Sequence, residues 1–111
     1  MNIIDIVRLI PAGWKSAKFE GEEHGASVSF FIVNSAPGTG PEAHRHPYEE
    51  IFIILEGAIE ADVDGKKETI QSGNVVIIPP NTWHGFKNIS DHTVRMVNIH
   101  PSPKMIQENR N

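Results

Sequence analysis

The 111-residue sequence contains no cysteine. Disulfide bonds, thiolate metal sites and cysteine nucleophiles are therefore excluded. No apolar run approaches the roughly 20 residues that a membrane-spanning helix needs. The formal net charge is -4, so the chain offers no basic stripe for nucleic acid or for anionic lipid. These absences predict a protein with neither nucleic acid nor membrane as a partner.

The N-terminal residues do not have the pattern of a secretion signal. Residues 1–8 lack a basic region, and Asp5 interrupts their apolar stretch, so we expect a cytoplasmic protein. Hydrophobic residues make up 39% of the chain and charged residues 22%, which is typical of a folded globular protein. We expect residues 1–111 to form one domain. It would have an N-terminal strand or loop segment (1–26) and a C-terminal tail or short helix (101–111).

Short runs rich in valine, isoleucine and phenylalanine alternate with turn residues through the chain. Such runs at a spacing of roughly 8–12 residues indicate an all-β sandwich or barrel. Asp64 and Gly65 predict a type I′ hairpin, because that turn needs a positive φ at both central positions. The expected strands are residues 28–33, 51–55, 58–63, 75–78 and 94–99.

His44, His46 and Glu50 have the spacing of metal ligands. Side chains of an extended chain alternate between two faces, so these three positions share one side. Glu50 directly precedes the apolar run 51–55, where an ionised carboxylate is costly unless a cation or several hydrogen bonds compensate it. Solvated histidines and glutamates are the ordinary alternative, but a metal ion resolves this conflict better. His84, just past a Pro-Pro-Asn turn, is the candidate fourth ligand.

Two segments resemble the two sequence motifs of the cupin superfamily. Residues 38–57 read glycine, five residues, His-x-His, three residues, glutamate, six residues and glycine. Residues 73–88 read glycine, five residues, Pro-x-Asn, two residues, histidine, three residues and asparagine. Asn81 replaces the second glycine of that motif, and asparagine is the next-best residue for a positive φ after proline in a type II turn.

The resemblance implies an all-β jelly-roll barrel, the double-stranded β-helix of small single-domain cupins, with a metal site in its mouth. Carried over residue by residue, the family's ligands fall on His44, His46, Glu50 and His84. Three histidines and one carboxylate suit one divalent ion of iron, manganese, zinc, nickel or copper. A barrel that keeps the motifs without metal is the alternative, which the complete ligand set disfavours.

Side chains on the same faces as the ligands are expected to line a largely apolar pocket. Phe52 continues the face of Glu50, and Phe86 continues the face of His84. Tyr48, the only tyrosine, is a candidate acid–base or orienting hydroxyl, with simple packing as the alternative. No arginine or lysine is expected on the metal-facing side, which disfavours a strongly anionic substrate.

The last expected strand allows two orientations. If Arg95 faces solvent, then Met96, Asn98 and His100 reach the pocket. The opposite orientation is equally compatible with the sequence, because Val97 makes the other face more apolar.

These observations predict a metal-dependent enzyme acting on a small organic molecule that chelates the metal through oxygen atoms. A dioxygenase-like reaction is the leading hypothesis, with Glu50 moving a proton and Tyr48 assisting. A metal-dependent isomerase, lyase or cyclase follows. A non-catalytic small-ligand-binding or sensor module is the alternative, because a fold does not fix a function.

The apolar runs at residues 3–10 and 51–55 exceed what one small barrel should expose. We therefore expect a homodimer, in which the N-terminal strand pairs with the partner's sheet edge.

Overall fold

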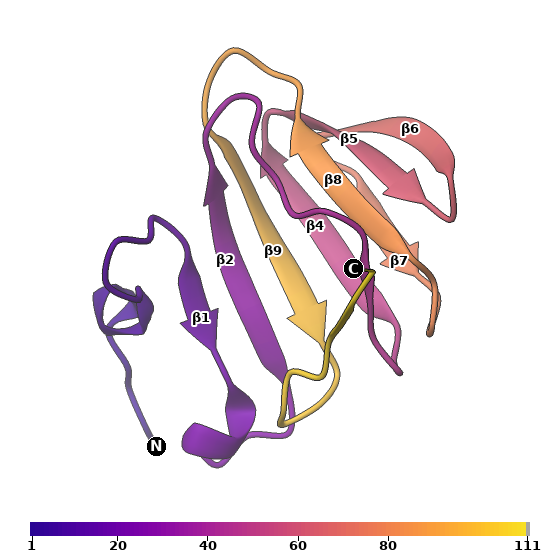
Figure 1. The fold of residues 1–111 in the computed structure, drawn as a ribbon. Coiled ribbons are helices and arrows are strands. Elements are labelled where there is room, and N and C mark those ends of the chain that lie inside the picture. The colour runs from indigo at the N-terminus through magenta and orange to yellow at the C-terminus, as the bar shows by residue number, and fades with distance from the viewer. Residues whose placement is uncertain (111) are drawn as a thin grey trace.

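The computed structural model describes residues 1–110, and these residues form short β-strands joined by turns (Figure 1). The helical segments among them are short 3-10 turns, and none is long and apolar enough to span a membrane. The elements in chain order are η1 (Ile6–Leu9), β1 (Ala17–Phe19), η2 (Gly21–Glu23), β2 (Ser29–Ser35), β3 (His44–Arg45), β4 (Glu50–Glu56), β5 (Ala58–Val63), β6 (Lys66–Gln71), β7 (Val75–Ile78), β8 (His84–Asn88), β9 (Val94–His100) and β10 (Glu108–Asn109).

The strands form two antiparallel sheets that face each other (Figure 1). The first sheet has the strand order β1-β2-β9-β4-β7, and the second has the order β10-β3-β8-β5-β6. Strands that follow one another in the sequence often belong to different sheets, so the chain crosses repeatedly from one to the other. This is the arrangement of a jelly-roll barrel, and the predicted all-β fold is confirmed.

The hydrophobic core lies between the two sheets and is built by alternation. On β4, Phe52 and Ile54 point inward and are buried, whereas Leu55 is exposed. The apolar run 51–55 is therefore buried on one face of the strand and not on both. Each large apolar side chain that leaves water contributes about 1.5–3 kcal/mol. The buried core residues are Phe52, Ile54, Ile59, Ala61, Ile70, Ile78, Phe86, Val94 and Met96.

The tight turns have the backbone conformations that the sequence predicts. Asp64 and Gly65 both have positive φ angles, of 53° and 83°, as a type I′ hairpin requires. Asn81 has a φ of 57°, so it takes the left-handed conformation expected at the motif's glycine position. Its backbone N–H donates to the carbonyl of His46 at 2.7 Å, which fixes this turn beside a predicted metal ligand.

The N-terminal end of the described chain differs from expectation. Ile6–Leu9 forms a 3-10 helix, so no N-terminal strand exists there to pair with a partner's sheet edge. At the other end, where the sequence left a tail or a short helix open, residues 101–110 form a tail that bends at 101–104 and is held to the barrel through backbone groups. Met105 N–H donates to Glu20 at 2.9 Å, and β10 pairs with β3. The tail therefore runs beside the strand that carries His44.

Candidate metal centre and its cavity

The four predicted ligands come from both sheets and meet at one end of the barrel. His44 on β3 lies directly opposite His84 on β8, His46 follows β3, and Glu50 begins β4 in the facing sheet. All four side chains are buried. Their ligand atoms lie within 4.8 Å of one another. Closure of the two sheets thus brings the four together, as the motifs predict.

Backbone carbonyls hold the three histidine rings in place. The Nδ1 atoms of His44 and His84 each lie 2.7–2.8 Å from the carbonyl two residues earlier in the chain. The Nδ1 of His46 lies 2.7 Å from the carbonyl of Ile106 in the tail. A carbonyl only accepts, so each Nδ1 carries the donated proton, and Nε2 is the nitrogen that faces Glu50 or would bind a metal ion. Metal-binding histidines are oriented in this way.

Glu50 lies at the centre of the cluster. Its Oε1 is 2.8 Å from His84 Nε2 and 3.1 Å from His46 Nε2, and its Oε2 is 3.1 Å from His100 Nε2. Burial by itself raises the pKa of the Glu50 carboxyl, but the imidazoles of His100, His46 and His84 outweigh burial and hold that pKa well below its ordinary value. An ionised carboxylate therefore stands among the Nε2 atoms.

Two buried nitrogens of the cluster lack a hydrogen-bond partner. They are the Nε2 atoms of His46 and of the neighbouring His100, each 3.1 Å from a Glu50 oxygen but not in hydrogen-bond geometry with any group of residues 1–110. Burial lowers the pKa of His44, which favours its neutral, metal-binding form. Imidazole nitrogens and a carboxylate directed at one point are the donor set of a single divalent ion. The residues present therefore fit one divalent metal ion.

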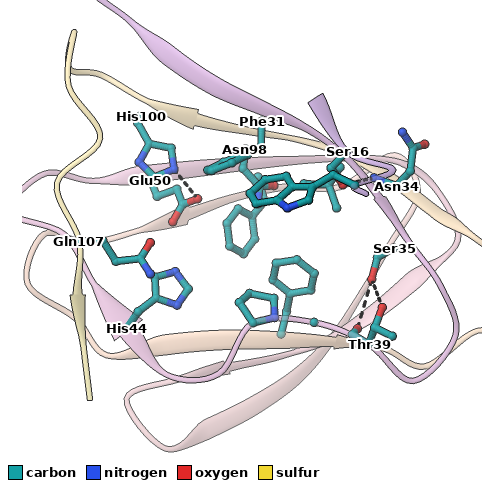
Figure 2. Close-up of a pocket in the computed structure, with 16 residues that line it drawn as sticks. Ser16, Phe31, Asn34, Ser35, Thr39, His44, Glu50, Asn98, His100 and Gln107 are labelled. Carbon is teal, nitrogen blue, oxygen red and sulfur yellow. Dashed lines mark hydrogen bonds and ion pairs between the residues drawn. The ribbon is translucent and has the colours of Figure 1, made fainter. Parts of the chain in front are cut away.

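A cavity of about 320 Å³ ends at this cluster (Figure 2). His44, Glu50 and His100 lie at one end of it, and Ser35 and Thr39 lie at the other. Among residues 1–110, no lysine or arginine lines the cavity. A molecule in the cavity therefore reaches the metal-binding end through an uncharged passage. The apolar wall residues are Trp14, Phe31, Val33, Pro41, Phe52 and Phe86.

The structure decides the orientation of the last strand. Arg95 is exposed, and the alternate residues of β9 are buried. Asn98 and His100 line the cavity. Met96 belongs to the hydrophobic core and is not among the residues that line the cavity. Phe52 and Phe86 line it from opposite sheets, with ring centroids 5.6 Å apart.

Tyr48 lies beside the metal cluster and not in the cavity wall. Its ring stacks on His46 with centroids 5.3 Å apart. Its hydroxyl forms a 2.7 Å hydrogen bond with His100 Nδ1 and accepts the N–H of Ile106 at 3.1 Å. Tyr48, His100 and Glu50 therefore form a continuous chain of polar contacts that leads to the cluster.

Sequence reasoning missed the parts of the site that come from outside the motifs. Trp14 and Gln107 line the cavity from the two ends of the chain, and the carbonyl of Ile106 orients His46. A backbone carbonyl can come from any residue type, so no sequence signal points to Ile106. The tail has few apolar residues, and its pairing with β3 depends on contacts that only the folded barrel provides.

The cupin-domain family model matches residues 31–100. The chain belongs to the cupin family. This match includes all four ligands. The ligand positions that the motif resemblance assigned therefore lie within the matched domain.

Two curated relatives and one solved structure illustrate the range of proteins to which this cupin is similar. It is 38% identical over 81 residues to "Polyketide synthase CurC" of Streptomyces cyaneus, which covers 71% of this chain and 52% of the relative. It is 39% identical over 56 residues to "Gentisate 1,2 dioxygenase 1" of Aquipseudomonas alcaligenes, which covers 50% of this chain and 16% of the relative. The chain thus spans at most about half the length of these curated relatives.

The solved structure is oxalate decarboxylase of Lactobacillus farciminis in its formate complex. It superposes with a TM-score of 0.84 at 21% identity, over 96% of this chain and 35% of that one. Identity this low shows a shared fold and no more.

Proposed function

We propose that this cupin is a metal-dependent enzyme, dioxygenase-like in its reaction, that acts on a small organic molecule binding the metal through oxygen atoms. One observation carries the proposal: the cavity ends at the ligand cluster, and two of the four ligands, His44 and Glu50, form part of its wall. Four protein ligands leave one or two positions of a five- or six-coordinate ion for a substrate.

The cavity wall supports an uncharged or weakly anionic substrate with apolar surface. Aromatic and aliphatic side chains cover most of its length, and no basic side chain lines it among the described residues. A small dianion such as oxalate would gain no positive partner here besides the metal ion, whose charge Glu50 already partly offsets. The dioxygenase relative supports an aromatic substrate, and the polyketide synthase relative supports a diketone or enol.

We assign proton transfer to Glu50 and an assisting role to Tyr48. When bound, the metal ion polarises a substrate oxygen and, if it is a redox metal, allows reaction with dioxygen. On loosening from the metal, the carboxylate of Glu50 would accept a proton from the substrate, whose acidity the bound ion would raise. His100 Nε2 contacts the outer oxygen of that carboxylate, and the Tyr48 hydroxyl binds the far side of His100. The Tyr48–His100 pair thereby orients Glu50 toward the cavity.

A metal-dependent cyclase, from the isomerase, lyase and cyclase group, is the second candidate. The match to a polyketide synthase over 71% of this chain favours it, because polyketone chains bear chelating oxygens and cyclise through enolates. The same Glu50 carboxylate then removes the proton that forms the enolate.

The test begins with metal analysis of protein purified without chelator. Protein loaded with Fe(II), Mn(II) or Zn(II) is then screened for oxygen uptake with catechols, diketones and thiols. Oxygen uptake that depends on Fe(II) or Mn(II) selects the oxygenase. Product formation without oxygen uptake selects the cyclase group. Tight ligand binding without any turnover contradicts both and leaves the sensor module.

We also propose a homodimer that forms through the outer face of the first sheet. Apolar residues lie side by side across four strands there, because Ile77, Ile51 and Ile99 are in register on β7, β4 and β9, and Phe30 follows on β2. A second apolar row, Val75, Ile53, Val97 and Ile32, runs beside it.

The cytoplasmic location expected from the sequence stays a prediction, which imaging of a fluorescent fusion in cells tests.

A further inference from the structure

Asn98 is the polar side chain of the cavity wall that stands out after the metal cluster is accounted for. It is 6% exposed and lies on β9, one inward-facing position before His100. Its Oδ1 is fully buried and has no hydrogen-bond partner within residues 1–110. Leaving such a group unsatisfied costs about 1–3 kcal/mol, so its persistence inside an apolar cavity requires an explanation.

Other polar side chains of the cavity wall already have partners. Ser35 Oγ lies 2.7 Å from Thr39 Oγ1, and Asn34 Nδ2 donates to the carbonyl of Lys15. Ser16 Oγ accepts from the backbone, and Gln107 donates to Asn109. Asn98 therefore differs from these groups in having an acceptor that lacks a partner among residues 1–110 and that reaches the cavity when the amide turns.

The surroundings of Asn98 define what can approach it. Phe31 on β2 and Phe52 on β4 are its direct neighbours in the sheet, and both line the cavity. Figure 2 shows Asn98 on the cavity wall between the His100 and Glu50 end and the Ser35 and Thr39 end. Two residues along a strand span roughly 7 Å, so Asn98 lies about one aromatic ring beyond His100.

We infer that Asn98 is a substrate-binding residue that selects a hydroxylated planar molecule, with one more hydroxyl group about one ring away from the oxygens that bind the metal. The inference rests on the proposed function and specifies its substrate class. An amide can turn to present its carbonyl or its NH₂ group, and a hydroxyl group satisfies either because it both donates and accepts. The apolar ring of the substrate would lie against Phe52 and Phe86.

Two catechols of equal size test this inference. Hydroxyquinol and homocatechol share the metal-chelating pair of oxygens, and they carry a hydroxyl or a methyl group at the same ring position. Binding to zinc-loaded protein is measured by isothermal titration calorimetry under nitrogen, so that no turnover occurs. Wild-type protein is expected to prefer hydroxyquinol roughly tenfold, which is the effect of one buried hydrogen bond.

Asn98→Leu keeps the side-chain volume and removes the amide. We expect this variant to lose the preference or reverse it, with homocatechol bound as well as before. Asn98→Val, whose branched side chain suits a strand, serves the same purpose if the leucine variant does not fold, and circular dichroism checks both.

The possible outcomes separate this inference from the proposed function. Equal affinities in wild type, or a tenfold preference that persists in both variants, overturns the role of Asn98 while zinc-dependent binding of homocatechol still supports a chelating substrate. If neither catechol requires zinc for binding, the proposed function fails and the inference fails with it.

Discussion

The two ring nitrogens of His46 face different groups. Its Nδ1 binds the carbonyl of Ile106, and its Nε2 is buried, directed at Glu50 and without a hydrogen-bond partner among the described residues. A side chain held by one nitrogen so that the other faces a carboxylate is arranged for a cation. His44 and His84 are likewise held by their Nδ1 atoms against backbone carbonyls, and the Nε2 of His84 lies 2.8 Å from Glu50 Oε1.

His46→Ala is expected to abolish stoichiometric metal binding while the barrel stays folded, because it removes one of four ligands from a site that the sheets position independently. Metal content after dialysis and circular dichroism measure the two effects. His92→Ala is the matched control, since the exposed imidazole of His92 lies outside the cluster and contacts Asp91. Full metal content in the His46 variant would refute the site.

Tyr48→Phe removes one hydroxyl that binds both His100 and Ile106. If that hydroxyl orients the Glu50 proton acceptor, kcat falls roughly a hundredfold, whereas KM and metal content hardly change. The lost hydrogen bonds also lower the free energy of unfolding by about 1 kcal/mol. Steady-state kinetics and urea unfolding separate the two effects. An unchanged kcat with reduced stability would show that Tyr48 serves packing alone.

The ionised Glu50 makes the metal-free protein sensitive to acid. Its pKa in the folded state lies below the ordinary value of 4.5, so its stabilising effect is present above that pH and is lost as the pH falls further. Urea unfolding of metal-free protein between about pH 6 and pH 3 is expected to show this loss. Glu50→Gln should show a weaker pH dependence over the same range. Identical pH profiles for both proteins would contradict the assignment.

At the scale of elements, the loop of residues 38–43 packs closely against β8. Part of this loop forms one wall of the cavity. The loop runs along the strand through bonds such as Asn88 N–H to the carbonyl of Thr39 at 2.8 Å. Gly40 permits this approach, because a Cβ atom there would lie 1.9 Å from the carbonyl oxygen of Phe86. The absence of a side chain at Gly40 thus lets the loop, which lines the cavity, contact β8, the strand that carries His84.

Gly40→Ala is therefore expected to lower the free energy of unfolding by about 1–3 kcal/mol, the usual cost of overpacking. The displaced loop should also weaken metal binding, because His44 follows it directly. Thermal unfolding and zinc titration measure both. Glu42→Ala, an exposed position in the same loop, should change stability by less than about 0.5 kcal/mol. Equal effects of the two substitutions would argue against close packing at Gly40.

The sequence predicts those elements whose residues alternate strongly, and it predicts ligands that local spacing defines. The expected strands at 58–63 and 75–78 have the bounds observed for β5 and β7. The strand β6 was missed because Ile70 is its one buried residue, which leaves little apolar alternation. The partners of His46 and the contribution of Trp14 were missed because they depend on long-range packing.

At the scale of the whole molecule, the outer face of the first sheet carries two apolar rows that one chain leaves partly exposed. Val75 and Ile77 on the edge strand are 64% and 67% exposed, and the two apolar rows continue inward from them. Contiguous apolar surface of this kind marks an interface, and a two-fold arrangement would cover it with the same surface of a second copy.

Ile53→Lys combined with Ile77→Lys is expected to convert a dimer into a folded monomer, because it places two charges in the centre and at the edge of this face. Light scattering coupled to size-exclusion chromatography gives the mass of each protein. Ile89→Lys is the control, since Ile89 is similarly exposed but lies in the turn after β8. A wild-type protein that remains a single chain at all concentrations would overturn the homodimer.

His46 Nδ1 donates a hydrogen bond to the carbonyl of Ile106 in the tail. Docking of the tail and the affinity of the site for metal are therefore coupled. By linkage, whatever favours the docked tail tightens the ion, and the ion in turn favours the docked tail by the same free energy. Protease cleavage within residues 101–110 should therefore slow as zinc is added, and cleavage should release the ion. The terminal segment has few apolar side chains of its own, so the fraction of molecules with a docked tail would rise with the concentration of the metal ion.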